Sequence, residues 1–184
     1  MSAPGRTTSI RFTRRLARWM PVCVLALAGA SASASDPAAV QQMLREGRTA
    51  EALLAVDQGL KARPQDLQWR FLRGVVLTEQ NKLGEAEAQF VQLAAERPDL
   101  PEVYNNLAVV YSRQDQYEKA RQALEMSVRL QPRNALAHEN LGDVYAKLAA
   151  QSYARALDHQ PGHAGLPVKL ALVRELFSPL PRPR

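Results

Sequence analysis

The sequence predicts an all-α protein built from helical hairpins that stack side by side. Three sets of residues recur at intervals of 34: Ala52, Ala86 and Ala120; Gly74, Ala108 and Gly142; Pro64, Pro98 and Pro132. Small residues allow two helices to cross closely, and a proline ends a helix because it cannot donate a backbone hydrogen bond. An interval of this length has room for two helices and their turns. One hairpin cannot bury its own apolar face, so we expect the core to form between stacked hairpins.

The third interval, "PEVYNNLAVVYSRQDQYEKARQALEMSVRLQP", carries the fullest pattern. It resembles the tetratricopeptide repeat at Tyr104, Leu107, Ala108, Tyr111, Tyr117, Ala120, Leu124 and Pro132. The resemblance implies an all-α, tetratricopeptide-type helical-hairpin solenoid over residues 35–161, with units at about 33–66, 67–100, 101–134 and 135–161. It indicates fold more strongly than function, because this fold serves many unrelated roles.

Capping residues mark the expected helix starts. Asp36 precedes Pro37, which is favourable at the first helical position because its missing N–H is not needed there. Asp66 and Asn134 stand where the first helices of the second and fourth units should begin. Asp115, with an acidic residue three positions later, resembles a capping box and is therefore predicted to cap the second helix of the third unit.

The fourth unit lacks a turn between its two helices. Tyr111 and Ala120 of the third unit are nine residues apart, whereas Tyr145 and Ala149, at the matching positions, are four apart. Either a tight bend survives at 146–148 or the helices have fused, and good helix formers favour fusion from about 136 to 158. The fused helix would be roughly 35 Å long. Its predicted apolar stripe comprises Leu141, Tyr145, Leu148, Ser152 and Ala156. The array is therefore predicted to have three full pairs plus a fourth with the turn deleted.

The C-terminal region, residues 162–177, is predicted to form a capping helix. Its segment "LPVKLALVRELF" places Val168, Leu172 and Leu176 on one side, and we expect it to pack against Tyr153 and its neighbours. The alternative is that this helix packs onto a second copy. The protein is therefore expected to be a monomer if the helix caps its own chain, or a weak homodimer if it packs onto another. Residues 178–184 contain three prolines and are predicted to be a flexible tail.

Residues 1–34 have the three parts of a secretory signal peptide. Five arginines and no acidic residue precede or flank an apolar run, "WMPVCVLALAGA", and small residues come after it. The run is too short to cross a bilayer, which needs roughly 20 residues. We therefore expect cleavage after Ala34 and export to a bacterial periplasm, without a membrane span in the mature protein. The alternative is an N-terminal anchor in the inner membrane. Because Cys23 is the only cysteine, no disulfide is expected after cleavage.

The charge is unevenly distributed along the chain. The net charge is +6, yet residues 35–162 carry 15 basic and 17 acidic residues. A nucleic-acid-binding domain should present a basic surface, and the charge balance of this central region argues against that class of partner. A protein or peptide partner is expected instead.

In the tetratricopeptide family, the first helix of each pair lines a concave groove. The resemblance therefore implies groove residues at Phe71, Val75, Asn105, Asn106, Val109, Arg113, Glu139, Asn140, Asp143 and Lys147. Asn106 and Asn140 are 34 residues apart, on the same rung of the array. In groove-binding members, asparagines at this rung hold the backbone of an extended peptide, since an amide both donates and accepts hydrogen bonds. Tolerance of asparagine on a solvated face is an equally simple explanation.

No catalytic, cofactor or metal site is predicted, and the protein is not expected to be an enzyme. His159 and His163 are four residues apart, but proline and glycine between them predict a loop rather than a metal-binding helix face. Asp143 and Lys147 are predicted to form an ordinary i,i+4 ion pair. The predicted function is a non-enzymatic periplasmic scaffold that binds a partner or extended peptide, with envelope assembly as one such role. The alternative is a structural subunit that oligomerises through its C-terminal helix.

Overall fold

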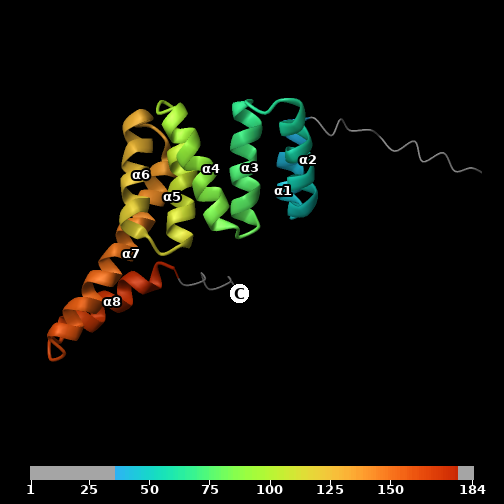
Figure 1. The fold of residues 1–184 in the computed structure, drawn as a ribbon. Coiled ribbons are helices and arrows are strands. Elements are labelled where there is room, and N and C mark those ends of the chain that lie inside the picture. The colour runs from blue at the N-terminus through green and yellow to red at the C-terminus, as the bar shows by residue number, and fades with distance from the viewer. Residues whose placement is uncertain (1–35, 178–184) are drawn as a thin grey trace, which may run out of the picture. The chain divides into compact units, whose positions relative to one another are not determined.

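The computed structural model describes residues 36–177. The predicted signal peptide (1–34) and the predicted tail (178–184) lie outside the described residues. Within the described range the structure is helical throughout, without strands (Figure 1). The helices are α1 (Pro37–Arg45), α2 (Thr49–Ala62), α3 (Leu67–Glu79), α4 (Leu83–Glu96), α5 (Pro101–Arg113), α6 (Tyr117–Leu130), α7 (Ala135–His159) and α8 (Gly165–Glu175).

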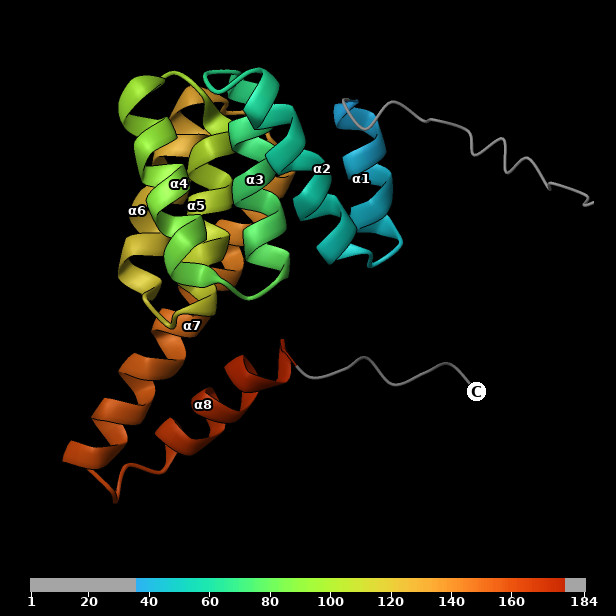
Figure 2. The same cartoon turned by 45° about the vertical axis from the view of Figure 1, so that its right-hand side comes forward.

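Helices α1 to α6 form three hairpins, α1–α2, α3–α4 and α5–α6, which stack in chain order (Figures 1 and 2). The three hairpins contact each other through α2 with α3 and α4 with α5, and the third hairpin contacts the fourth unit through α6 with α7. The predicted all-α solenoid of three complete pairs is confirmed. Apolar clusters fill the spaces between successive helices, as expected for units that bury their faces only by stacking.

The turns inside the three hairpins share a left-handed backbone residue. Gly47, Asn81 and Asp115 have φ of 72°, 58° and 59°, and they are 34 residues apart. Glycine, asparagine and aspartate are the residues that tolerate this conformation best. The capping-box prediction for Asp115 is therefore wrong. Its carboxylate accepts a hydrogen bond from Tyr117 Oη at 2.5 Å, and no side chain caps the N-terminus of α6.

The other predicted caps are confirmed. Asp36 Oδ1 accepts a hydrogen bond from the backbone N–H of Ala38, and Asp66 Oδ1 accepts one from Gln68, both at 2.9 Å. Asn134 Oδ1 accepts one from Ala137 at 3.2 Å. Because each cap fixes the start of a first helix, these residues set where α1, α3 and α7 enter the stack.

A close contact inside the second hairpin depends on a glycine. A Cβ on Gly74 would lie 2.6 Å from the Phe90 ring, so α3 and α4 approach at this point only because residue 74 has no side chain. The same hairpin holds a buried guanidinium: Arg70 on α3 is 6% exposed and makes a two-pronged ion pair with Glu96 on α4. These two contacts fix the crossing of α3 and α4.

The fourth unit has no hairpin of its own. Helix α7 runs for 25 residues without a break, which confirms the predicted fusion. Its first half packs on α6 and α5, and its second half packs on α8. Figure 1 shows the second half continuing past the end of the stack, with α8 lying beside it. Gly142 is at the position of Gly74, yet a Cβ there would meet nothing within 4 Å. No second helix covers this face of α7 within the described residues.

Helix α8 packs on α7 through a different face from the predicted one. Leu166 and Leu170 are its buried residues, and the ammonium of Lys169 lies 5.8 Å from the centroid of the Tyr153 ring. Val168, Leu172 and Leu176 are 59%, 60% and 71% exposed, so the apolar side that we expected to face α7 faces away from it. The segment contains two apolar sides, and the 3.6-residue period alone did not decide which one packs.

Candidate functional site

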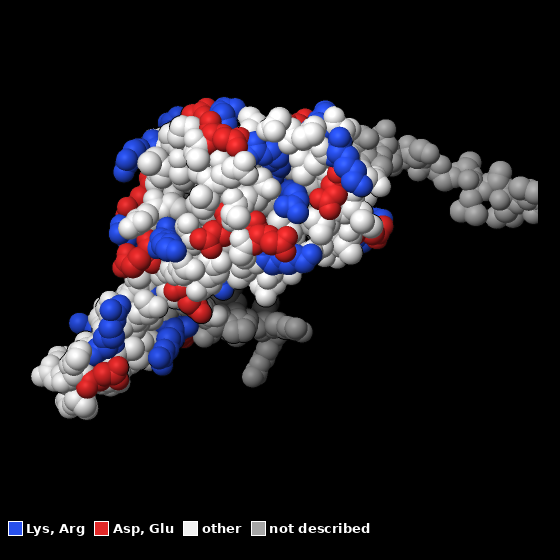
Figure 3. Space-filling view, in the orientation of Figure 1, with Lys and Arg blue, Asp and Glu red and all other residues white. Residues whose placement is uncertain are grey.

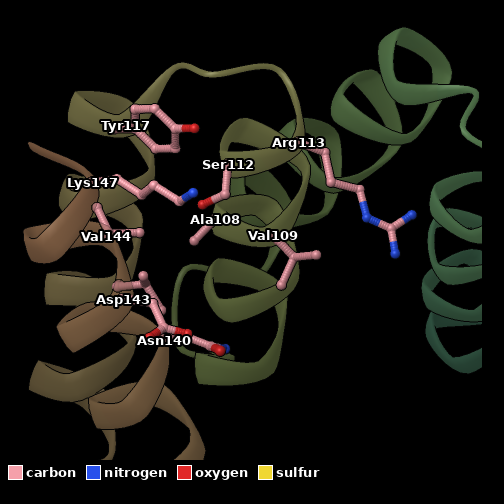
Figure 4. Close-up of a pocket in the computed structure, with 10 residues that line it drawn as sticks. Ala108, Val109, Ser112, Arg113, Tyr117, Asn140, Asp143, Val144 and Lys147 are labelled. Carbon is pink, nitrogen blue, oxygen red and sulfur yellow. The ribbon is translucent and has the colours of Figure 1, made fainter. Parts of the chain in front are cut away.

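The main candidate site is a hollow of about 230 Å³ between α5, α6 and α7. Figure 4 shows Asn140, Asp143, Val144 and Lys147 of α7 along one side and Ala108, Val109 and Ser112 of α5 along the other. Tyr117 and Leu124 of α6 complete the lining. The hollow therefore lies between α5 and α7, the first helices of successive units, with α6 beside them.

The amide side chains of Asn140 and Asn105 contact each other directly. Asn140 Nδ2 donates to Asn105 Oδ1 at 2.9 Å, and Asn105 is only 8% exposed. The side chain that Asn140 contacts is thus that of Asn105. Asn106 Nδ2 donates instead to the backbone carbonyl of Glu102 at 2.9 Å. Since no hydrogen bond among residues 36–177 uses Asn140 Oδ1, this oxygen and the second amide hydrogen remain available to a ligand.

Arg113 lines the hollow, but its guanidinium is hydrogen-bonded to the neighbouring hairpin. Its guanidinium donates to the backbone carbonyl of Thr78 at 2.6 Å and to Glu79 at 3.2 Å. Figure 4 shows the side chain directed toward the neighbouring hairpin, away from Lys147. Arg113 therefore ties the C-terminal ends of α5 and α3 together and is a positioning residue for the groove wall.

The predicted ion pair between Asp143 and Lys147 does not form. The Lys147 ammonium instead lies 4.0 Å from the centroid of the Phe177 ring, just after α8, in cation–π geometry. Asp143 is exposed and makes no ion pair with any described residue. The contact with Phe177 keeps the Lys147 ammonium away from Asp143. An i,i+4 rule does not include such a long-range contact.

A second, larger hollow of about 520 Å³ lies where α7 leaves the stack. It is lined by Asp115, Tyr117, Lys147, Ala150, Gln151, Ala154, Arg174 and Phe177. Tyr117 and Lys147 line both hollows, so the two adjoin. The hydrogen bond to Asp115 raises the pKa of Tyr117 to about 12, so this hydroxyl stays protonated and points its hydrogen at Asp115. Sequence reasoning missed Tyr117 and Ser112, because it considered only the inward positions of first helices.

The two apolar residues predicted for the groove lie elsewhere. Phe71 is half-buried, packs edge-on against Phe90 with centroids 5.7 Å apart, and lines a separate apolar hollow of about 230 Å³ between α3, α4 and α5. Val75 packs in the same cluster. Glu139 is exposed and does not line the hollow beside Asn140. Of the ten predicted residues, the structure brings together Val109, Arg113, Asn140, Asp143 and Lys147, with Asn105 directly behind Asn140.

Charges of both signs are mixed on the surface. Figure 3 shows Lys and Arg interspersed with Asp and Glu, with no large region of one sign on that face. Across residues 36–177, no group of three His, Cys, Asp or Glu side chains is placed to hold a metal ion. His163 Nδ1 accepts a hydrogen bond from the backbone N–H of Gly165 at 3.2 Å, which fixes the turn before α8. None of the helices in the described part of the chain is long and apolar enough to cross a membrane.

Two models of the tetratricopeptide repeat match the sequence, over residues 38–101 and 77–143. The chain belongs to the tetratricopeptide repeat family. Repeats of this family typically serve protein–protein interaction and are not catalytic. The second match ends at residue 143, inside α7, where the regular alternation of hairpins also ends.

Known proteins share the fold over most of the described chain. The curated protein PYG7, a chloroplastic tetratricopeptide repeat domain-containing protein of Arabidopsis thaliana, is 36% identical over 88 residues, a match that covers 42% of this chain. The chain spans only 29% of that relative. A thermophilic tetratricopeptide protein of Thermus thermophilus superposes with a TM-score of 0.56 at 21% identity, covering 78% of this chain and all of that one. The second tetratricopeptide domain of human RPAP3, solved with the HSP70 peptide SGPTIEEVD, gives a TM-score of 0.54 at 18% identity, covering 60% and 92%.

Proposed function

We propose that this protein is an exported, non-catalytic module that binds an extended segment of a partner protein in the hollow between α5 and α7. The observation that carries the proposal is the Asn105–Asn140 amide pair. Asn105 is buried and holds the amide of Asn140 in place. Asn140 keeps one acceptor and one donor free at the surface of the hollow. One peptide unit presents one donor and one acceptor, so the pairing is matched.

The other lining residues suit a peptide backbone better than a small metabolite. Ala108, Val109 and Val144 give the floor an apolar surface, and Asp143 and Lys147 supply one charge of each sign at its edge. A related domain, that of human RPAP3, was solved with a bound peptide, which supports this class of ligand. Export to the periplasm, and a role there in envelope assembly, rest on the signal-like residues 1–34 and form part of the proposal.

A peptide selection tests the binding proposal. Peptides selected from a random displayed library on the purified protein should bind wild type and lose affinity about tenfold for Asn140→Ala, because two hydrogen bonds are removed. Gln122→Ala on α6 is the matched control, since Gln122 is exposed and outside the hollow. Equal affinities for all three proteins would reject the groove as the binding site.

Export is tested separately. The full sequence expressed in a Gram-negative host should yield an osmotic-shock product whose N-terminus is Ser35, and deletion of residues 1–34 should leave the product in the cytoplasm. An uncleaved product in the membrane fraction would favour the N-terminal anchor instead.

A further inference from the structure

The uncovered side of α7 is an ordered stripe rather than a random surface. His138, Gly142, Tyr145, Ala149, Ser152 and Ala156 alternate at intervals of four and three residues, and at 100° per residue they fall within an arc of about 80°. Four of them are exposed and the two alanines are half-buried. We call these six residues the α7 stripe. This spacing is the one by which helices pack against each other along their length.

The ring of Tyr145 is the largest side chain of the α7 stripe. It is 48% exposed, and its hydroxyl donates to Glu125 of α6 at 3.2 Å. This hydrogen bond anchors the ring at its polar end and leaves part of its apolar surface exposed to solvent. The ring is therefore held ready for a contact that the described chain does not itself supply.

Charge is excluded from the α7 stripe over almost the whole helix. The Asp, Glu, Lys and Arg residues of α7 all lie on the remaining circumference: Glu139, Asp143, Lys147, Arg155 and Asp158. A surface helix that met only water would have no reason to keep one side free of these residues over about five turns. The stripe therefore has the composition of a buried seam.

The α7 stripe is also symmetric about its own midpoint. His138 and Ala156, Gly142 and Ser152, and Tyr145 and Ala149 form three pairs that are equidistant from residue 147, which is the centre of Ala135–His159. When two copies lie antiparallel about a two-fold axis at residue 147, each large or open position meets a small one. Tyr145 then faces Ala149, and His138 faces Ala156. Such self-complementarity is required of an isologous interface and not of a contact with an unrelated partner.

The repeat itself indicates what the missing partner helix looks like. Gly74 on α3 makes room for Phe90 on α4, the second helix of the same unit. A Cβ at the corresponding Gly142 would meet no atom within 4 Å. Counting back from the proline that ends each unit, Tyr153 of α7 matches Leu124 of α6, the second-helix residue clustered with Ala108. The second half of α7 thus has the residues of a second helix but cannot fold back on its own first half. The antiparallel pairing of two copies places Tyr153 of one copy beside Gly142 of the other.

We propose that two copies of this chain associate through their α7 stripes. The second half of α7 in each copy then takes the place of the second helix that the fourth unit of the other copy lacks. The occupant of the stripe is a second copy. A loop too short to let a segment fold back on its own chain favours such exchange between copies. The α7 stripe, from His138 to Ala156, is about 27 Å long, and the surface buried on both copies is on the order of 1,000 Å², the lower end of specific interfaces. The dimer should accordingly be of moderate affinity.

The binding hollow stays open in this dimer. Asn140, Asp143 and Lys147 lie at least about 100° around α7 from the centre of the stripe, on the side that faces α5. The dimer would present two hollows and bind a repetitive or dimeric partner more tightly than the monomer. A single peptide occupies one hollow, away from the stripe, so its binding does not depend on dimerisation and the two proposals can fail separately.

Light scattering on the purified protein tests the proposal. At about 100 µM the wild type should have a mass near twice that of its chain and should dissociate on dilution. Ser152→Glu places a charge in the seam at an exposed helical position and should weaken association at least about tenfold. Gln151→Glu, one residue away and off the stripe, should not. Circular dichroism of both variants confirms that α7 remains helical.

Two further measurements decide between contact surfaces. In a Cys23→Ser background, His138→Cys and Ala156→Cys should be joined by a short bismaleimide when mixed, and neither variant should be joined to itself. Leu172→Glu, on the exposed apolar side of α8, should leave the dimer intact. A monomer at about 100 µM overturns the proposal, as does linkage of either cysteine variant to itself. Dissociation by Leu172→Glu assigns the contact to α8 and overturns it equally.

Discussion

The second and fourth units of this protein place a glycine at the same point of the repeat, with opposite consequences. Gly74 receives the Phe90 ring, and a Cβ there would lie 2.6 Å from it; a Cβ on Gly142 would meet nothing within 4 Å. The first helices are alike, so the difference arises in the residues after them. In the second unit, Asn81 turns the chain in a left-handed conformation; in the fourth, residues equivalent to "SRQDQ" (112–116) are missing and the helix continues. A few turn residues decide whether a hairpin closes.

Restoring the turn should produce the largest change. Insertion of Ser-Arg-Gln-Asp-Gln between Tyr145 and Ala146 should let the second half of α7 fold back on Gly142 and bury Tyr153 and Leu157. Burial of two such side chains is worth about 3 kcal/mol in the free energy of unfolding. Urea unfolding measures this gain, and small-angle scattering should show a smaller radius of gyration. Insertion of five alanines at the same point should lengthen the helix and give neither effect.

The two glycines should respond to alanine in opposite directions. Gly74→Ala forces Phe90 aside and should lower the free energy of unfolding by about 2 kcal/mol. Gly142→Ala meets no neighbour and should raise it by about 0.5–1 kcal/mol, because alanine favours helix. Thermal unfolding at low micromolar concentration, where the proposed dimer should dissociate, measures both. Equal losses would show that a second helix covers Gly142 after all.

The ion pair between α3 and α4 has no counterpart on α7 and should make the second unit acid-sensitive. Hydrogen bonds from Arg70 lower the pKa of Glu96 below its ordinary value of 4.5. The carboxylate therefore stabilises the fold above that pH, and its contribution is lost as the pH falls through the lowered pKa. Glu96→Gln should lower the urea midpoint at pH 7, since Arg70 is left buried without a charged partner.

The pH dependence provides the control for this prediction. The urea midpoint should fall as the pH is lowered from about 7 through the lowered pKa of Glu96, and it should fall less for Glu96→Gln than for wild type. An unchanged difference in the variant would mean that the pair contributes nothing to acid sensitivity.

A small effect concerns the turn residue itself. Asn81→Ala places alanine at φ 58° and should cost about 1 kcal/mol, whereas Asn81→Gly should be neutral or slightly stabilising. Ala149 is 34 residues after Asp115 but lies inside α7, so Ala149→Gly should destabilise instead, by about 1 kcal/mol. Denaturant midpoints of the three variants measure the contrast. A stabilising Ala149→Gly would indicate a latent turn at this position.

Local rules predicted much of this fold, and long-range contacts account for what they missed. The 34-residue spacing, the caps at Asp36, Asp66 and Asn134, and the fusion of α7 each depend on neighbours in sequence, and the structure confirms them. Asp115 fits a capping box locally, but the turn of the third hairpin requires it in a left-handed conformation.

The candidate site was predicted less completely for the same reason. Five of the residues that the repeat register predicts line one hollow, but the register did not predict the hydrogen bond between Asn140 and Asn105. The loss of the Asp143–Lys147 pair depends on Phe177, thirty residues beyond Lys147. Which side of α8 packs on α7 also depends on the orientation of α8 as a whole, which no periodicity specifies.

The central claim is that the fourth unit is one straight helix whose second half does not cover its first. Spin labels at Glu139→Cys and Asp158→Cys, in a Cys23→Ser background diluted with unlabelled protein, test this within one chain by pulsed electron resonance. About nineteen residues of continuous helix predict a separation near 28 Å. A closed hairpin would bring the labels within about 15 Å, and that distance would contradict the claim.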